Sequence, residues 1–380
     1  MPCLCAEHGF FVGTVEACFL LTLLPVARKR KETQRQVDMA RYSATISNKH
    51  MVAVRFSSMG DIVLTTGVLL NWHKKHGTMF TVVTKEAFEP LFENHPAVQN
   101  VIGCDDKDLH GQNQPILFRR IMEMYKDSPL LDLHRNLRTG MMARIWRDAI
   151  LIYKQMSFAR RIFLWSKGKF FGEALRKFNV PQRYAIGLYD EAEVPGPGEL
   201  RPCLFLSEEE KGWAAEKLEA LREVGKPLIA LHPFATHSAK SWPMDVWMEF
   251  ASMLRENGIP YFWVGRGDGL PESEAVRSFV NATGLRELCA LLDGADVLVT
   301  GDSGPMHLAT AVQTPALAMF GPTCREWGFF PSGEKDRVIQ LDMPCRPCSL
   351  HGSGVCSRGN ACITGITPER ILTELKDMLG

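Results

Sequence analysis

The most regular hydrophobic pattern of the chain lies in its last third. The β-branched and aliphatic run Val297–Thr300 predicts a buried strand, and Gly301-Asp302-Ser303-Gly304 predicts a tight turn after it. Pro305 then opens a helical segment, Met306–Val312, because a proline in the first turn of a helix loses no intrahelical hydrogen bond. A second apolar run, Ala316–Phe320, returns as a strand. The stretch therefore predicts one βαβ unit.

The same alternation begins at Met51. Met51 to Phe56 is nearly all apolar, which is typical of a strand that is buried on both faces of a parallel sheet. Ile62 to Lys75 places apolar residues near one face and ends in two lysines, which favour the negative end of a helix. Further strands are predicted at 80–84, 98–102 and 130–133, with a short helix at 88–94. This order is typical of a doubly wound α/β domain.

A second set of alternating elements begins after Pro195-Gly196-Pro197-Gly198, the strongest turn signal in the chain. Its predicted strands are 227–231, 261–264, 297–300 and 316–320, and its predicted helices are 208–223, 244–256, 285–292 and 306–312. We therefore expect two Rossmann-like domains, 51–198 and 199–380, the second ending in a Cys-rich loop and a helix. Ligands of such sheets bind at the carboxyl ends of the strands, so the polar turns of both domains are expected to face a central cleft.

Residues 1–50 differ from the rest of the chain. The apolar run Phe10–Val26 contains Glu16 and Pro25 and precedes four basic residues, whereas a secretory signal carries its positive charges before its apolar run. Two interpretations stay open. Either this is a short signal-anchor with a basic cytoplasmic flank, or 1–50 is a poorly ordered extension that comes from a start site assigned too early, since a clean strand begins at Met51.

Composition narrows the class of protein. The chain has 380 residues, of which 46% are apolar and 23% charged, as is usual for a soluble protein of two or three domains. Its net charge of +1 provides no global basic field, so a nucleic-acid partner is not implied. The 11 cysteines are odd in number and spread over a long chain, which favours a reducing compartment over a disulfide framework.

The turn at 301–304 has the residues of a phosphate-and-sugar site. Gly301 and Gly304 let the backbone approach a ligand closely, and the helix after them offers unpaired N–H groups and a partial positive charge. Asp302 can accept hydrogen bonds from sugar hydroxyls. The alternative is an ordinary strand-to-helix turn with Asp302 or Ser303 as its N-cap.

Five short segments together carry a family resemblance. They are Ser57-Ser58-Met59-Gly60-Asp61, Asp132-Leu133-His134 with Arg138, the stretch from His232-Pro233 to Lys240-Ser241-Trp242-Pro243, the segment Gly301-Asp302-Ser303-Gly304-Pro305-Met306-His307-Leu308-Ala309, and Phe320-Gly321-Pro322-Thr323. In this order and spacing, the chain from Met51 to about Leu379 resembles the ADP-heptose:lipopolysaccharide heptosyltransferase family, glycosyltransferase family 9. The resemblance implies a GT-B fold, with the acceptor on the first domain and the nucleotide-sugar on the second. It also implies inversion at the anomeric carbon without a required metal.

The resemblance further implies roles for individual residues. Asp61 matches the proposed catalytic base, which takes the proton of the acceptor hydroxyl. Lys240 matches the lysine that reaches the donor phosphates, and Asp302 is expected at the heptose hydroxyls. The other matched positions are Thr236, Ser303 and Gly304 at the phosphates, Glu272 or Glu274 at the ribose, His307 as support, and Ser57, Ser58, Gly60 and Arg138 on the acceptor side. Simpler alternatives stay open: Asp61 as a helix-dipole charge, Lys240 as a solvated surface lysine and His307 as a structural histidine.

Other sequence signals are weaker. Gly265-Arg266-Gly267-Asp268-Gly269 lacks the spacing of a dinucleotide-binding turn, and the chain has no Walker A sequence and no H-E-x-x-H. Cys345, Cys348, Cys356 and Cys362 open with a Cys-x-x-Cys pair and contain the ligand type of a zinc site. Their later spacings are not those of a standard zinc ribbon. We therefore expect reduced loop thiols and no metal, with structural zinc as the alternative.

The expected function is an inverting, metal-independent transfer of heptose from ADP-heptose to the inner core of lipopolysaccharide, with Kdo or the first heptose as acceptor. No cofactor is expected beyond the donor substrate. The enzyme is expected to be a cytoplasmic monomer, peripheral at the inner face of the inner membrane, where it meets the lipid A-core acceptor. Three alternatives stay open: a transferase of another nucleotide-activated sugar to a cell-envelope glycan, a nucleotide-sugar epimerase of the same fold, and a binding protein that has lost catalysis.

Overall fold

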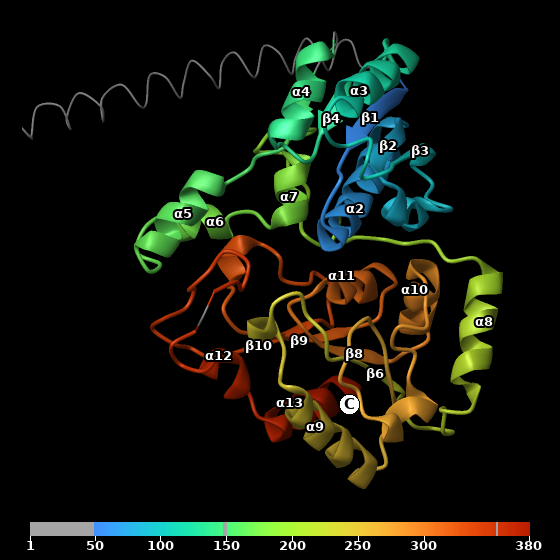
Figure 1. Cartoon of the computed structure of the whole chain (residues 1–380), viewed down its shortest axis with the longest axis vertical. Coiled ribbons are helices and arrows are strands. Elements are labelled where there is room, and N and C mark those ends of the chain that lie inside the picture. Colours follow the sequence, from blue (N-terminus) through green and yellow to red (C-terminus); the bar gives the residue numbers. More distant parts are fainter. Residues whose placement is uncertain (1–48, 147–149, 355) are drawn as a thin grey trace, which may run out of the picture. The chain divides into compact units, whose positions relative to one another are not determined.

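The computed structural model describes residues 49–146, 150–354 and 356–380. Residues 49–380 form one compact unit with two five-stranded parallel sheets (Figure 1). The predictions for the N-terminal extension, including the apolar run 10–26, lie outside the described residues, apart from its last two positions. In the part of the chain that the structure describes, no helix is both long and apolar enough to cross a membrane.

The first sheet has the strand order β3-β2-β1-β4-β5. Its strands are β1 (His50–Val54), β2 (Met79–Lys85), β3 (Val98–Cys104), β4 (Leu130–Asp132) and β5 (Ile150–Ile152). The helices of this part are α2 (Met59–His76), the 3₁₀ helix η1 (Glu86–Phe92), α3 (Asn113–Met124), α4 (Leu137–Ile145), α5 (Ser157–Trp165), α6 (Gly172–Arg176) and α7 (Val180–Ala185). The strand order reverses between β1 and β4, so the turn after β1 lies where ligands of such sheets bind.

The second sheet has the order β10-β9-β8-β6-β7. Its strands are β6 (Ile229–His232), β7 (Tyr261–Trp263), β8 (Val297–Gly301), β9 (Ala316–Phe320) and β10 (Arg337–Gln340). The accompanying helices are α8 (Glu208–Glu219), η2 (Ser238–Lys240), α9 (Met244–Glu256), η3 (Glu272–Arg277), α10 (Leu285–Asp293), α11 (Gly304–Ala311), η4 (Arg325–Trp327), α12 (Ala361–Thr364) and α13 (Pro368–Leu379). Here the order reverses between β6 and β8, which brings the turns after these two strands together.

The central strands are buried because apolar side chains cover both faces of each sheet. Every residue of β6, β8 and β9 is buried, as is β1 from Met51 onward. Under the second sheet, Trp247 and Phe250 of α9 pack with Trp263 of β7. The predicted fold class, two doubly wound α/β sheets, is therefore confirmed.

The elements with the strongest periodicity were predicted best. Helix α9 and strand β9 have the predicted bounds. Helix α2 begins at Met59, three residues before the predicted start, and the predicted short helix at 88–94 is a 3₁₀ helix at Glu86–Phe92. The predicted domain boundary at Gly198 falls between β5 and β6, and it stays a prediction.

Candidate active site

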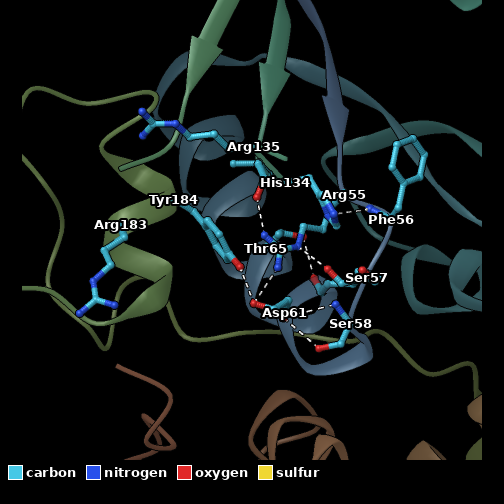
Figure 2. A network of polar contacts seen from close by, with 12 residues as sticks. Arg55, Phe56, Ser57, Ser58, Asp61, Thr65, His134, Arg135, Arg183 and Tyr184 are labelled. Atoms are coloured by element: carbon cyan, nitrogen blue, oxygen red, sulfur yellow. Dashed lines mark hydrogen bonds and ion pairs between the residues drawn. The ribbon is translucent and has the colours of Figure 1, made fainter. Parts of the chain in front are cut away.

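Asp61 lies in the first turn of α2, directly beyond the carboxyl end of β1 (Figure 2). Its Oδ1 lies 2.8 Å from the Arg55 guanidinium and accepts a hydrogen bond of 2.9 Å from the Tyr184 hydroxyl. Its Oδ2 accepts from the Ser58 hydroxyl at 2.9 Å and from the Ser58 backbone N–H at 3.3 Å. The side chain is 17% exposed, so these partners enclose most of it.

The charge state of Asp61 results from opposing effects. Burial alone raises the pKa of this carboxyl, because an apolar environment disfavours the charged form. The Arg55 guanidinium and the hydrogen bonds from Ser58 and Tyr184 outweigh burial, so the pKa of Asp61 lies below its usual value. Burial and the nearby Asp61 charge raise the pKa of Tyr184 well above its usual value, so the phenol stays protonated and donates. Asp61 is therefore a carboxylate at neutral pH, as a general base must be.

Arg55 holds this arrangement together and was not singled out from the sequence. Its Nε donates to the Ser57 carbonyl at 2.7 Å and its Nη1 to the Leu133 carbonyl at 2.5 Å, while Nη2 faces Asp61. A signal was available, since Arg55 is the one charged residue in the apolar run Met51–Phe56. Tyr184, which lies 123 positions from Asp61 on α7, had no such signal.

The donor-side turn lies between β8 and α11. Ser303 occupies the N-cap position of α11, yet its hydroxyl makes no capping bond. That hydroxyl instead lies 3.0 Å from Thr300 Oγ1 and 3.3 Å from His232 Nδ1. No side chain of the N-cap residue therefore occupies the first N–H groups of this eight-residue helix. N–H groups that stay free to donate are the usual feature of an anion-binding helix end. The alternative that Asp302 or Ser303 serves only as an N-cap is not supported.

Lys240 and Asp302 are paired with each other. The Lys240 ammonium lies 2.7 Å from Asp302 Oδ2, and the Thr323 hydroxyl donates to the same oxygen at 2.7 Å. The two side chains are 17% and 10% exposed, so Lys240 is not a freely solvated surface lysine. Gly301 permits this approach, because a Cβ there would collide with the Lys240 carbonyl oxygen. The turns after β6 and β8 are thus joined at the predicted phosphate and sugar residues.

The N-terminal ends of α2 and α11 touch. A Cβ on Gly60 would lie 2.7 Å from Cδ2 of His307, and the Met59 side chain packs against Gly304. Asp61, one residue after Gly60, is therefore brought next to the donor-side turn. This is the meeting of the polar turns that the sequence predicted, and it unites residues from both sheets.

His307 lies at this contact. It is 4% exposed, and its Nδ1 has no hydrogen-bond partner among the described residues. Burial lowers the pKa of His307, although the charges of Asp302 and Asp61 act in the opposite direction. The imidazole is therefore neutral at physiological pH and keeps one ring nitrogen unpaired beside the two helix ends.

Other predicted residues have different surroundings. Glu274 is 4% exposed and accepts from Tyr261, Trp263 and Arg255 at 2.8 to 2.9 Å, whereas Glu272 is exposed. Thr236 is exposed in the loop after β6. Arg138 on α4 lies 3.3 Å from His110 Nε2 and makes no bond to the Asp61 network. Ser57 contributes its carbonyl to Arg55.

The four C-terminal cysteines are not gathered into a metal-binding group among the described residues. Cys345, Cys348, Cys356 and Cys362 are all free thiols. Within residues 49–146, 150–354 and 356–380, no group of three or more His, Cys, Asp or Glu side chains is arranged to hold a metal ion. Burial raises the pKa of Cys348 and Cys362, which favours the thiol form. The zinc alternative therefore has no geometric support in the described part of the chain.

Comparison with known proteins agrees with this geometry. Residues 188–354 match the model of glycosyltransferase family 9 (heptosyltransferase). The chain carries a glycosyltransferase family 9 domain. The domain includes the turns after β6 and β8, and hence Lys240, Asp302 and Ser303.

The proteins that this chain resembles in sequence are heptosyltransferases by name. It is 27% identical to lipooligosaccharide heptosyltransferase 2 of Campylobacter jejuni over 41% of this chain and 52% of that protein, so the match spans about half of the relative's length. It is 26% identical to lipopolysaccharide heptosyltransferase 1 of Pseudomonas aeruginosa over 87% of this chain and 98% of that protein. The solved structure of Escherichia coli ADP-heptose LPS heptosyltransferase II covers 87% of this chain and 98% of its own, with a TM-score of 0.63 and 20% identity. That likeness shows the GT-B fold.

Proposed function

We propose that this chain is an inverting glycosyltransferase that moves heptose from ADP-heptose to a hydroxyl of the lipopolysaccharide inner core. One observation supports this most strongly. The first turn of α2, which carries the ionised Asp61, touches the start of α11, whose N-cap Ser303 makes no side-chain capping bond. The Lys240–Asp302 pair lies directly before that helix. A base from one sheet and an anion-binding turn from the other are the two parts that such a transfer needs.

In the proposed reaction, Asp61 acts as general base. The Oδ2 oxygen is the better proton acceptor, because its partner Ser58 is exposed and can be displaced by an acceptor hydroxyl, whereas Oδ1 is fixed by Arg55 and Tyr184. As the acceptor oxygen forms its bond to the anomeric carbon, its proton passes to Oδ2. The bond between that carbon and the diphosphate oxygen breaks, and the electron pair leaves with ADP.

The departing diphosphate gains charge that the donor-side turn offsets. Lys240 supplies a compact positive charge, and the N–H groups at the start of α11, including those of Ser303 and Gly304, supply hydrogen bonds and the positive end of the helix dipole. Thr236 in the loop after β6 adds a hydroxyl. Since Lys240 contacts Asp302 in the structure, we propose that donor binding redirects Lys240 to the phosphates and frees Asp302 for the sugar hydroxyls.

The ribose is assigned to Glu272. Both oxygens of Glu274 are occupied by neighbouring side chains inside the fold, and a buried carboxylate in this state is structural. Glu272 lies two residues away, is exposed, and has both oxygens available to accept from ribose hydroxyls. His307 supports the contact between the two helix ends.

The acceptor is proposed from the relatives. The names of the Pseudomonas and E. coli proteins place their activity on lipopolysaccharide, so a lipid A-core carrying Kdo or a first heptose is the acceptor class we propose. Such an acceptor is anchored in a membrane, which would require the enzyme to work as a peripheral protein at the cytoplasmic face. The acceptor side would include Ser57, Ser58, Gly60 and Arg138.

Incubation of the purified full chain with ADP-heptose and each of two acceptors, one ending in Kdo and one in a first heptose, tests the proposal. Mass spectrometry is expected to show a gain of one heptose on one acceptor, also in the presence of EDTA. Conversion of the donor without any acceptor would instead indicate an epimerase. Binding of the donor without conversion would indicate a protein that has lost catalysis.

A further inference from the structure

The outer face of α5 carries large aromatic side chains in solvent. Phe158 is 72% exposed and Trp165 is 79% exposed. Arg161, which is also exposed, lies between them at positions i+3 and i−4, so the three side chains share one helix face. Exposed apolar side chains that form a contiguous patch often mark an interaction site.

The turn after α5 continues the same kind of surface. Phe170 and Phe171 are 56% and 46% exposed, and the rings of Phe158 and Phe171 lie 6.5 Å apart in an edge arrangement. Lys167 and Lys169 are exposed beside them. We call this surface, from Ser157 to Phe171, the aromatic hairpin.

The aromatic hairpin carries three cations that have no charged or aromatic partner among the described residues. Arg161, Lys167 and Lys169 form no ion pair or cation–π contact with the residues that the structure describes. Neighbouring basic residues differ, since Lys154 and Lys177 both pair with Glu191, and Arg176 pairs with Glu326. The free positive charge therefore coincides with the exposed aromatics.

The inner face of the hairpin is fixed close to the candidate site. Phe163 packs against Trp327, with ring centroids 5.7 Å apart, and Arg160 donates to the Trp327 carbonyl at 2.8 Å. Arg183 donates to the same carbonyl at 2.8 Å, and the next residue, Tyr184, holds Asp61. The hairpin is thus bonded to the same carbonyl as Arg183, the neighbour in sequence of Tyr184. This anchoring fixes the orientation of its outer face, and Figure 1 shows α5 and α6 side by side.

We propose that the aromatic hairpin docks on an anionic phospholipid surface. Aromatic rings lie at the level of lipid headgroups, and Lys and Arg beside them pair with anionic headgroups. A protein partner fits less well, because lysine is depleted in protein interfaces. The inference deepens the proposed function, and it rests on that function only in assigning the membrane as the place where the acceptor is met.

Vesicle binding of the full chain tests this without any sugar substrate. Flotation is measured with phosphatidylcholine vesicles and with vesicles that also contain phosphatidylglycerol. The charge variant Arg161→Gln/Lys167→Gln/Lys169→Gln is expected to bind the anionic vesicles on the order of 100-fold more weakly. Each lost cation is expected to weaken binding by roughly fivefold, because one Lys or Arg near an anionic surface contributes about 1 kcal/mol. Its matched control, Lys107→Gln/Lys126→Gln/Lys335→Gln, removes three exposed lysines elsewhere and is expected to bind as the parent does.

The aromatic variant Phe158→Ser/Trp165→Ser/Phe171→Ser is expected to lose at least tenfold in binding to both kinds of vesicle. Its control, Val224→Ser/Val276→Ser, removes apolar side chains that are 106% and 87% exposed. Circular dichroism confirms that each variant is folded. A single Trp165→Phe variant should also lose the part of the tryptophan emission that brominated lipids quench.

Parent-like vesicle binding by both hairpin variants overturns the proposal and assigns any binding to another part of the chain. A change of oligomeric state in the aromatic variant, measured by sedimentation without lipid, overturns it in favour of contact between copies. A transfer assay separates this outcome from failure of the proposed function. Both hairpin variants should glycosylate a water-soluble, deacylated acceptor at the parent rate and should lose activity on the same acceptor in vesicles.

Discussion

Replacement of Asp61 by asparagine tests the proposed base most directly. Asparagine has nearly the same size and keeps one accepting oxygen for Arg55 and Tyr184, but its amide takes up no proton at neutral pH. Turnover should therefore fall by about 10²- to 10⁴-fold, the usual range for loss of a general base. Among the described residues, Asp61 makes no hydrogen bond or ion pair to the donor-side turn, so ADP affinity should stay within about twofold.

The same substitution has a structural cost that can be separated from the chemical one. Arg55 is 8% exposed and would lose its counter-charge, and the Ser58 N–H would face an amide instead of an accepting oxygen. Weakening a charge-assisted contact of this kind costs about 1.5–3 kcal/mol. At about 2–4 °C for each kcal/mol, the expected fall in Tm is roughly 3–12 °C.

Steady-state kcat and KM should be measured well below the Tm of the variant, with ADP affinity measured by calorimetry. Tyr184→Phe is the matched control, because it removes one hydrogen bond from the carboxylate and leaves the base in place. Its turnover should fall less than tenfold. Parent-like turnover of Asp61→Asn would refute the assignment. An equal loss in Tyr184→Phe would mean that the network matters for structure and that Asp61 is not the base.

Four further predictions follow from the donor side. Lys240→Ala should weaken ADP binding about 10- to 100-fold by calorimetry; unchanged affinity would contradict phosphate contact. Asp302→Ala should lower the preference for ADP-heptose over ADP by a similar factor while ADP alone binds as well or slightly better, because its competitor for Lys240 is gone; equal losses for both ligands would exclude sugar recognition. Glu272→Gln should raise KM for the donor with little change in Tm. Glu274→Gln should lower Tm with little change in KM. Burial lowers the pKa of His232 to about 4, so between about pH 6.5 and 4 the unfolded chain binds more protons than the folded one. The free energy of unfolding should therefore fall by about 3 kcal/mol over that range. His232→Gln should make the free energy of unfolding, measured with urea, less dependent on pH.

Local pattern was sufficient to predict most of the fold, because strands buried on both faces read as uninterrupted apolar runs. Strand β9 is an example, and helix α9 was predicted from the spacing of its apolar residues. The pattern failed at β5 and β10, which lie at the edges of their sheets. Strand β5 has three residues, although the sequence around it is apolar from 149 to 153, and β10 has four, of which only Ile339 is buried.

The candidate site was predicted in part. Asp61, Lys240 and Asp302 were predicted because they match family positions in the segments that follow β1, β6 and β8. The partners that set their charge state were missed, since Tyr184 reaches Asp61 only through tertiary packing. Glu272 and Glu274 could not be separated by sequence, because their difference lies in which one turns toward Tyr261 and Trp263.

The carbonyl of Trp327 makes the two halves of the chain interdependent. It accepts hydrogen bonds from Arg160 and Arg183, which precede the predicted boundary at Gly198, although Trp327 itself follows that boundary. Arg183 is 2% exposed, so a first half expressed alone would have to bury a guanidinium without its Trp327 and Glu326 acceptors or expose the surface around it. A division of the chain at the predicted boundary would therefore separate residues that stabilise one another. Engineered chimaeras should carry residues 325–329 together with α5 and α7.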